Sequence, residues 1–431
     1  MLPEGWTKER VKDRGEVQAG RQRAPSFLDG EMTKYLRVAN VFDGYIDTTD
    51  VLEMPFTPEE RSRYLLSAGD LLLNEGQSLA LVGRPALYLG SPADCCFQNT
   101  LIRFRPGSNT CSHFALQKFR LCLYDGTFKT IATQTTSIAH LGVSRFANLK
   151  LAWPPLVEQR RIVEILAAWD EAIGTTHRLL ANSRQQKLSV LNKTLRIPAA
   201  ITEVADRDRS GTHPPSVRAG IPRLPQTPSG WQRVHLGKHL REVRRPVTLE
   251  PQCDYTLVTV KRSRGGVHRR EVLRGSEVKT HTQFIVKAGD FLMSKRQIVH
   301  GACGIVPPEL DGAVVSNEYA VLNSDGGIDL NFLRYLSESI YFQQTCFHSS
   351  IGVHVEKMIF KTERWLAWPF NIPPLSEQRR IVEVLDAATA EVAAMERQLG
   401  ALKLEKESLM QQLLTGKRRV HLTEAAAETT A

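Results

Sequence analysis

The sequence predicts an α+β fold built by internal duplication, with two mixed α/β domains that are each followed by a long helix. Two observations indicate this architecture. The stretch PPLVEQRRIVEIL, starting at Pro154, returns as PPLSEQRRIVEVL at Pro373, with eleven of thirteen positions identical and an offset of 219 residues. The segment after each copy has helical periodicity, whereas the segment before it has short strand-like runs between turns.

The duplication extends over most of the chain. GWTKERVKDRGEV from Gly5 resembles GWQRVHLGKHLREV from Gly230, and LSAGDLLLNEGQ from Leu66 resembles VKAGDFLMSKRQ from Val286. A chain of 431 residues is long enough for several separate cores. The predicted segments are a domain at 1–153, a helix at 154–197, a linker at 198–221, a second domain at 222–372, a second helix at 373–417 and a tail at 418–431.

Each domain is predicted to mix strands with one helix. In the first domain the predicted strands are Tyr35–Val41, Asp70–Leu73, Leu79–Leu89 and Thr100–Phe104, and the helix is Ser112–Tyr124. In the second domain the predicted strands are Tyr255–Lys261, Asp290–Ser294 and Tyr319–Asn323, followed by one amphipathic helix at Asp329–Gln344.

The segments after the repeated motifs have coiled-coil character. Between Leu375 and Thr415 there is no proline, and nine of ten heptad a and d positions are apolar. Lys187 and Lys406 occupy the same a position in the two copies, where a polar residue helps to fix register. The alternative is that each lysine extends to solvent from a short helix. Two helices with matching seams in one chain are expected to pack on each other.

The charge of the chain favours an acidic partner. The formal net charge is +10 and the pI is about 9.3, so nucleic acid is the first candidate and an anionic membrane the second. The sequence has no P-loop, no GxGxxG after a strand and no HExxH. We therefore expect no catalytic residue, metal site or cofactor in this chain. Seven cysteines without a CxxC pair, and an N-terminus without an apolar run, favour a soluble cytoplasmic protein.

Polar and basic loops in both domains are candidate DNA contacts. Arg and Lys can bind guanine edges, Asn and Gln can bind adenine edges, and all of them, with Ser, can bind phosphates. The alternative for each loop is a solvated surface turn. The candidates are Asn74, Gln77, Ser78, Arg84, Gln98, Asn99, His140, Ser144 and Arg145 in the first domain, and Lys261, Arg262, Arg264, Lys295, Arg296, Gln297, His300, Asn317 and His354 in the second.

The repeated PPLxEQRRIVExL motif, each time after a variable domain and before a long helix, resembles the DNA-specificity (S) subunit of type I restriction-modification enzymes. LMQQLLTGKRRV at Leu409 resembles the end of such subunits, and GDLLLNEGQSLALVGRPALY resembles one of their target-recognition domains. The resemblance covers essentially the whole chain.

The resemblance implies two target-recognition domains that each bind one half of a bipartite asymmetric DNA site, separated by two helices in an antiparallel coiled coil. It implies two methyltransferase subunits that use S-adenosylmethionine to methylate adenine, and restriction subunits that use ATP and Mg. The implied methyltransferase-docking residues are Glu158, Gln159, Arg160 and Arg161 in the first motif and Glu377, Gln378, Arg379 and Arg380 in the second.

Two other hypotheses stay open at the level of sequence. The chain could be a structural coiled-coil adaptor whose basic domains bind RNA or another protein. It could also be a nuclease with an unrecognised site. The adaptor hypothesis predicts no sequence-specific DNA binding with a methyltransferase present, and the nuclease hypothesis predicts metal-dependent cutting by the isolated chain.

Overall fold

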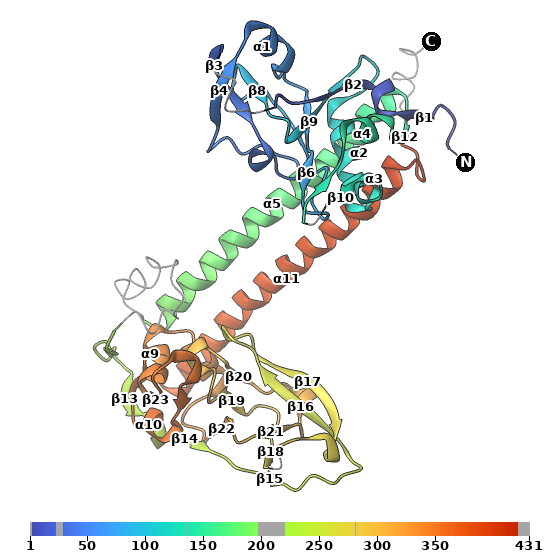
Figure 1. The fold of residues 1–431 in the computed structure, drawn as a ribbon. Coiled ribbons are helices and arrows are strands. Elements are labelled where there is room, and N and C mark those ends of the chain that lie inside the picture. Colours follow the sequence, from blue (N-terminus) through green and yellow to red (C-terminus); the bar gives the residue numbers. More distant parts are fainter. Residues whose placement is uncertain (1, 23–28, 136, 197–219, 281, 421–431) are drawn as a thin grey trace. The chain divides into compact units, whose positions relative to one another are not determined.

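The chain divides into two compact units, each made of one mixed α/β domain and parts of both long helices. Unit 1 comprises residues 1–177 and 397–431, and unit 2 comprises residues 178–396. The computed structural model describes residues 2–22, 29–135, 137–196, 220–280 and 282–420 (Figure 1). Most of the predicted linker at 198–221 and of the predicted tail at 418–431 therefore lies outside the described residues.

The main sheet of unit 1 is antiparallel and has the order β2-β9-β5-β7. A second sheet, β4-β3-β8, joins β3 to β4 antiparallel and to β8 parallel. Two small sheets, β1-β12 and β10-β11-β6, complete the unit. The strands are β1 (Thr7–Arg10), β2 (Gly15–Ala19), β3 (Glu31–Leu36), β4 (Leu52–Phe56), β5 (Leu71–Asn74), β6 (Gly76–Gln77), β7 (Pro85–Leu87), β8 (Cys95–Phe97), β9 (Leu101–Pro106), β10 (Thr133–Gln134), β11 (Ala139–His140) and β12 (Lys150–Trp153).

An aromatic core joins the domain of unit 1 to the long helices. Phe119 contacts Phe104, Phe128, Phe146 and Trp153 edge-on or tilted. The same core includes Ile162 and Leu166 of α5 and Met410, Leu413 and Leu414 of α11. Full burial of one such aliphatic side chain contributes roughly 1.5–3 kcal/mol to stability. The first turns of α5 and the last turn of α11 are therefore part of this core. The helices are α1 (Pro58–Tyr64), α2 (Ser112–Tyr124), α3 (Thr127–Ile131), α4 (Val143–Asn148) and α5 (Leu156–Thr194).

Unit 2 repeats this plan. Its main sheet has the order β14-β22-β19-β20, and a larger sheet has the order β15-β18-β21-β16-β17. The strands are β13 (Gln232–His235), β14 (Leu240–Glu242), β15 (Pro246–Val247), β16 (Asp254–Val260), β17 (Val267–Arg274), β18 (Gln283–Ile285), β19 (Phe291–Ser294), β20 (Cys303–Ile305), β21 (Val314–Ser316), β22 (Tyr319–Ser324), β23 (Ser350–Ile351), β24 (Ile359–Phe360) and β25 (Pro369–Ile372). The helices are α8 (Leu330–Leu336), α9 (Ile340–His348), α10 (Thr362–Leu366) and α11 (Leu375–Leu414).

The two units share one topology. The strands β2, β9, β5 and β7 correspond in order and pairing to β14, β22, β19 and β20. β16 pairs antiparallel with β17 and parallel with β21, as β3 does with β4 and β8. In each unit a first strand pairs antiparallel with the strand that precedes the long helix, β1 with β12 and β13 with β25. Equivalent positions can therefore be compared between the units.

One predicted helix is confirmed, and several other predicted elements differ from the observed ones. The helix Ser112–Tyr124 is confirmed as α2. The predicted strand Leu79–Leu89 is wrong over its first half, because residues 78–84 form a turn in which Gly83 has a φ of +79° and only Pro85–Leu87 are extended. Tyr35–Val41 is a strand only to Leu36. The predicted helix at Asp329–Gln344 is broken, because the side chain of Ser339 accepts from Phe342 N and begins a new helix.

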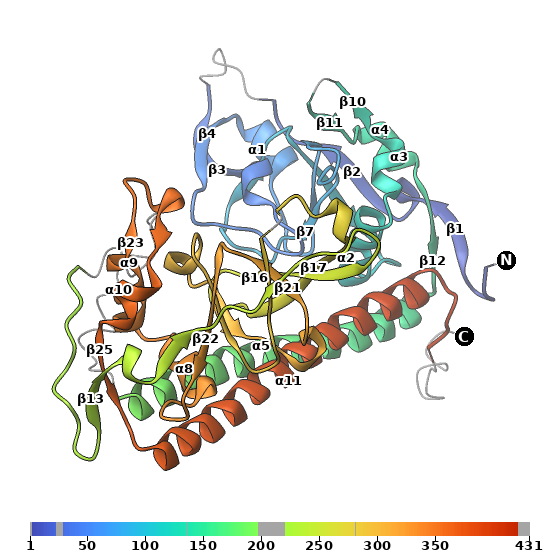
Figure 2. The same cartoon turned by 90° about the horizontal axis from the view of Figure 1, so that it is seen from below.

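Within each unit, the two long helices are buried at several positions of the predicted seam. The α5 and α11 segments of each unit lie side by side and run in opposite directions (Figures 1 and 2). Leu166, Leu180, Leu385, Leu399 and Leu413, all at predicted a positions, are buried. In unit 2 the Ser183 hydroxyl donates to Glu391, 3.0 Å away. None of the described helices is long and apolar enough to cross a membrane.

Candidate nucleic-acid interface

In unit 1 the structure brings several predicted DNA-contacting residues onto one loop surface. β6 pairs with β11, so Gly76 faces His140 and Gln77 faces Ala139. The His140 ring nitrogen Nδ1 lies 2.9 Å from the Glu75 carboxylate. Arg145 donates to the backbone oxygen of His140 at 2.8 Å. Gln77, His140 and Arg145 therefore lie close together.

The remaining candidates of this surface are Ser78, Gln98, Asn99 and Ser144. Ser78, Asn99 and Ser144 are exposed, and Gln98 is half-buried. The bend at 98–100 adjoins the start of the 75–84 loop, because Glu75 N donates to Thr100 O at 2.9 Å. These side chains can hydrogen-bond to base edges or phosphates without rearrangement of the sheet behind them.

Asn74 and Arg84 have structural roles instead. Asn74 is the last residue of β5 and is fully buried, with its amide nitrogen 3.5 Å from Val41 O. The prediction that its side chain contacts DNA is therefore wrong. Arg84 is half-buried, and its guanidinium carbon lies 4.8 Å from the centre of the Phe42 ring. Burial lowers the pKa of Arg84, and the nearby Asp43 opposes that shift.

A turn of aromatic residues next to Arg84 was missed from the sequence. In the turn FDGY, Phe42 and Tyr45 stack with ring centres 5.2 Å apart and planes 9° apart. Tyr45 is 58% exposed. Two aromatic residues flanking Asp-Gly are the signal that could have indicated this turn, because Asp-Gly favours tight turns with a positive φ. Gly44 has a φ of +83°.

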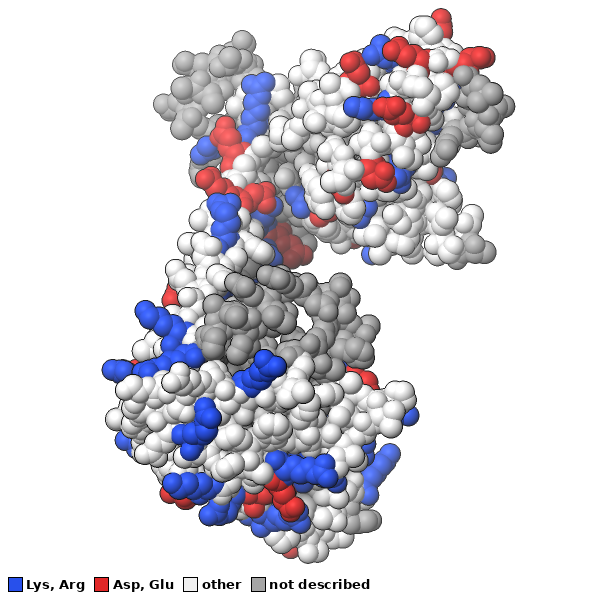
Figure 3. Space-filling model, turned by 90° about the vertical axis from the view of Figure 1, so that its left-hand side faces the viewer, with Lys and Arg blue, Asp and Glu red and all other residues white. Residues whose placement is uncertain are grey.

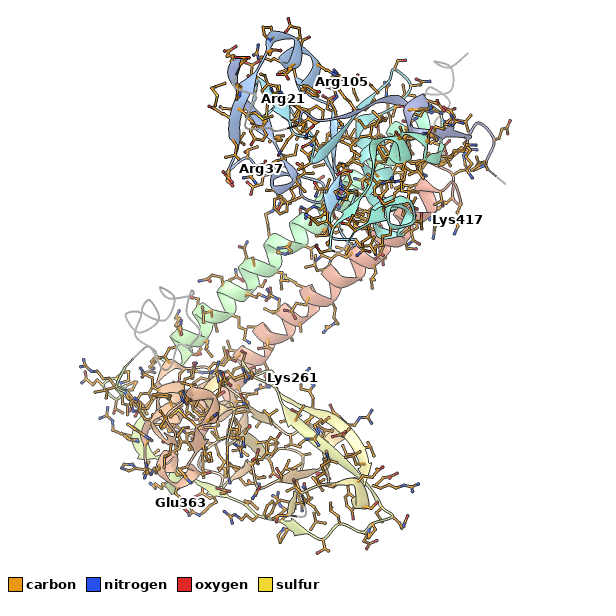
Figure 4. The ribbon with its side chains drawn as sticks, viewed as in Figure 1. Arg21, Arg37, Arg105, Lys261, Glu363 and Lys417 are labelled. Atoms are coloured by element: carbon orange, nitrogen blue, oxygen red, sulfur yellow. The ribbon has the colours of Figure 1, made fainter. Side chains whose placement is uncertain are left out.

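In unit 2 four loops form the corresponding surface. They are the β16–β17 turn at 261–266, the 295–301 segment after β19, the turn at 317–318 and the 352–358 segment between β23 and β24. Ser263 N donates to His300 O at 2.8 Å, and Lys295 N donates to Glu318 O at 2.8 Å. Figure 4 places Lys261 at the β16–β17 turn. Lysine and arginine predominate over acidic residues on the face of unit 2 seen in Figure 3.

Glu356 organises the centre of this surface. Arg262 donates to its carboxylate at 3.0 Å, and His300 Nε2 lies 3.1 Å from it without hydrogen-bond geometry. Burial lowers the pKa of His300, which favours the neutral imidazole. His354, in the same segment as Glu356, is exposed. Arg262 and His354 therefore present polar groups to solvent, whereas His300 is mostly covered.

Three further basic candidates, Lys295, Arg296 and Arg264, already have partners inside the unit. Lys295 donates to Glu242 at 3.0 Å, and Arg296 donates to Glu318 at 2.7 Å. Arg264 is half-buried and its Nε donates to Ser337 O at 3.0 Å, so one of its donors is already used inside the unit. Asn317 is exposed and Gln297 half-buried. A phosphate that approaches Arg296 competes with Glu318 for the guanidinium.

The glutamines of the two repeated motifs hold each domain on its helix. Gln159 is buried; it accepts from Cys111 N at 2.8 Å and donates to Asn109 O and Pro154 O. Gln378 is buried in the same way, accepting from Asp329 N at 2.8 Å and donating to Gly327 O and Pro373 O. Cys111 and Asp329 precede α2 and α8, so the two contacts are equivalent.

The glutamates of the motifs make a second equivalent pair of contacts. Glu158 accepts from the Trp6 indole at 3.1 Å and from Arg419 at 2.9 and 3.0 Å. Glu377 accepts from the Trp231 indole at 3.2 Å and from Arg196 at 3.4 Å. Each carboxylate thus joins the start of its domain to the segment that follows the other long helix within the same unit.

These contacts correct part of the predicted docking site. Glu158, Gln159 and Gln378 are buried, and their hydrogen bonds are made inside their own units, so their side chains are not a surface for a partner. Glu377 is half-buried. Arg160, Arg161, Arg379 and Arg380 are exposed and stay candidates for docking. Sequence identity of the whole motif did not distinguish its buried from its exposed members.

The equivalent lysines at the heptad a position have different partners. In unit 1 Lys406 of α11 pairs with Asp170 of α5. In unit 2 Lys187 of α5 lies 3.8 Å from Glu338, which belongs to the domain rather than to the other helix. Among the described residues, no group of three or more His, Cys, Asp or Glu side chains is placed to hold a metal ion.

The class of this fold is given by comparison with known families. Residues 3–182 match the family described as "Type I restriction modification DNA specificity domain". The chain is 24% identical to the putative type I restriction enzyme MjaX specificity subunit of Methanocaldococcus jannaschii, over 97% of this chain and 95% of the relative. It is 22% identical to the MjaVIII specificity subunit of the same organism, over 97% and 94%.

Solved structures show the same fold. The HsdS subunit from Thermoanaerobacter tengcongensis aligns with a TM-score of 0.52 at 18% identity, over 97% of this chain and 98% of that one. A chain from a structural study of the type I R-M system aligns with a TM-score of 0.57 at 18% identity, over 97% and 100%. Over nearly its whole length the chain is thus similar to specificity subunits of type I restriction enzymes, and its residues 3–182 match the family of their DNA-specificity domain.

Proposed function

We propose that this chain confers sequence specificity on a type I restriction-modification complex by binding a bipartite, asymmetric DNA site, one half-site with each unit. The observation that carries this proposal is that two units of one topology have different side chains on equivalent loops. Equivalent scaffolds allow the same mode of docking on DNA, and different side chains allow two different half-sites.

The second part of the proposal concerns the partners. Specificity subunits are the non-catalytic members of type I systems, so the chemistry belongs to methyltransferase and restriction subunits. The exposed arginine pairs at 160–161 and 379–380 lie one turn into each long helix, directly after the Glu-Gln pair. Two equivalent patches can bind two identical methyltransferase subunits. S-adenosylmethionine, ATP and Mg would be used by the partners, and this chain would need no cofactor.

The third part concerns the long helices. α5 and α11 each contribute residues to both units. We propose that they pack as an antiparallel coiled coil along their whole length and so set the number of unspecified base pairs between the half-sites. The buried heptad positions in each unit support this role.

The test is to express the chain with its own methyltransferase subunit and to map N6-methyladenine on host DNA by long-read sequencing. The expected result is one bipartite motif with a fixed unspecified gap. A stable complex that produces no new methylation, and that binds no DNA sequence preferentially, would contradict the proposal. In a matched control, the methyltransferase is combined with a chain in which two loop residues of unit 2, Arg262 and Arg296, are both replaced by alanine.

A further inference from the structure

The aromatic turn of unit 1 occupies the position of the basic turn of unit 2. The first lies in the connection from β3 to β4, and the second lies between the equivalent strands β16 and β17. Both turns are fixed near the start of the last strand of the main sheet. Gly44 N donates at 2.9 Å to the backbone oxygen of Pro85, the first residue of β7, and Arg264 N donates at 2.8 Å to that of Gly301, two residues before β20. One scaffold thus presents a basic turn in unit 2 and an aromatic turn in unit 1.

The aromatic turn is built as a stack. The Arg84 guanidinium covers Phe42, and Phe42 in turn stacks on Tyr45. Tyr45 is the outermost member and is 58% exposed. A single exposed aromatic residue on a protein surface is common and needs no explanation. Here, however, a cation and a second ring support the exposed ring from behind.

Four further contacts hold the turn rigid. Phe42 N donates to Tyr45 O at 3.0 Å. Asp43 accepts from Arg120 Nε at 2.9 Å and from the Tyr124 hydroxyl. Buried Asn74 lies behind the turn with its amide directed to Val41 O. A side chain that is already ordered loses little conformational entropy on binding, so an exposed ring held in this way is suited to contact a flat ligand.

We propose that Tyr45 stacks on a DNA base in the half-site bound by unit 1. This inference rests on the proposed function and specifies how one of its two surfaces contacts DNA. A base within a regular duplex has both faces covered by its neighbours. The base that Tyr45 contacts is therefore one whose stacking neighbour has been displaced, as happens next to an extruded nucleotide.

The experiment combines changes in the protein with changes in the DNA. The measured quantity is the dissociation constant of the complex of the full chain and its methyltransferase, on duplexes that carry the mapped site. Tyr45→Ala is combined with single abasic analogues placed in turn at each position of the site. We expect Tyr45→Ala to weaken binding to intact DNA about ten-fold, as loss of base–aromatic stacking does. At one position of the unit 1 half-site, removal of the base should abolish this difference.

The controls separate stacking from folding. Tyr45→Phe should keep the affinity within about two-fold, because the ring face remains. Leu89→Ala removes an apolar side chain that is even more exposed (75%) and lies beyond the other end of β7, and it should have no effect. Equal affinity of Tyr45→Ala and wild type, or the same loss at every abasic position, would refute stacking while leaving the proposed function intact. A wild-type complex without sequence preference would refute both.

Discussion

At the scale of the residue, Gln159 and Gln378 show why an identical motif need not be a functional surface. A buried primary amide that accepts one and donates two hydrogen bonds fixes three backbone groups at once. The two glutamines do this at equivalent places, just before α2 and α8. The repetition of the Glu-Gln pair in the sequence therefore follows from the need to fasten each domain to its helix.

We predict that Gln159→Ala lowers the free energy of unfolding of unit 1 by about 2–3 kcal/mol, since it leaves buried partners unsatisfied. The local measurement is hydrogen exchange: the amide of Cys111 should exchange faster in Gln159→Ala, and the amide of Asp329 in Gln378→Ala. Arg160→Ala, at the exposed neighbour, serves as the control and should change stability by less than about 0.5 kcal/mol. Unchanged protection of both amides would show that the glutamines are dispensable.

Arg296 carries the residue-scale prediction for DNA binding. Its guanidinium is about half exposed and pairs with Glu318, which a phosphate can replace. We predict that Arg296→Ala weakens binding nearly uniformly across sequences and reduces the slope of log affinity against log salt by about one, as for loss of a phosphate contact. Glu318→Gln should strengthen binding, because it removes a competing carboxylate. If neither variant alters affinity or salt slope, the 295–301 segment lies outside the interface.

Single residues were the least predictable from the sequence. Asn74 belongs to a polar stretch, NEGQ, but it ends a strand whose side chains are all buried. Arg264 and Arg262 are two residues apart in one basic turn, yet only Arg262 is exposed. Side-chain exposure depends on which distant segments cover a loop, such as Ser337 for Arg264. Local composition contains no information on those contacts.

At the scale of the element, the periodicity of apolar residues predicted the structure well where that structure depends on residues close together in the sequence. The helix α5 (Leu156–Thr194) lies within the predicted 154–197 and ends three residues early, and α11 (Leu375–Leu414) lies within the predicted 373–417 and also ends three residues early. The strand predicted at Leu79–Leu89 is absent at Gly83, which has a φ of +79° and packs against Phe128, where a Cβ atom would lie 2.4 Å from the ring. That contact joins segments 45 residues apart, so no window of sequence could indicate it.

The helix pair gives the element-scale prediction. Deleting one heptad from each helix, Thr176–Asn182 together with Ala394–Gly400, keeps the a and d pattern. Seven residues correspond to about 10 Å of helix, or about three base pairs of DNA at roughly 3.4 Å each. The methylated motif should therefore keep both half-sites with a gap shortened by about three base pairs. A four-residue deletion at the same places breaks the seam and should abolish activity. Full activity with an unchanged gap after the heptad deletions would contradict the ruler role.

At the scale of the whole molecule, the duplication gives two domains whose equivalent strands and loops can be compared with each other. The sequence repeat predicted two domains and two helices, and the two units indeed share one strand order. What the repeat could not indicate is that each long helix contributes to both units, or that Arg419 and Arg196 bind equivalent glutamates. These features depend on the helices meeting in opposite directions, which no local pattern encodes.

Equivalence of the domains leads to a prediction for the whole chain. Residues 11–149 lie between β1 and β12, and residues 236–368 lie between β13 and β25. A chimera in which a second copy of 236–368 replaces 11–149 keeps Trp6, Glu158 and Arg419. Ala167→Asp should be included, because Asp386, at the offset of 219, accepts from Tyr335 of the grafted domain at 2.5 Å.

The chimera should methylate a symmetric site, in which the half-site of unit 2 occurs twice as an inverted repeat. The physical reason is that each domain binds its half-site through its own loops, while the helices only set the distance between them. Mapping N6-methyladenine in cells that contain the chimera and the methyltransferase measures this directly, with the wild-type chain as the reference. Retention of the original unit 1 half-site would show that residues outside 11–149 select it. A motif in which both halves are new would show that the two domains do not bind DNA independently.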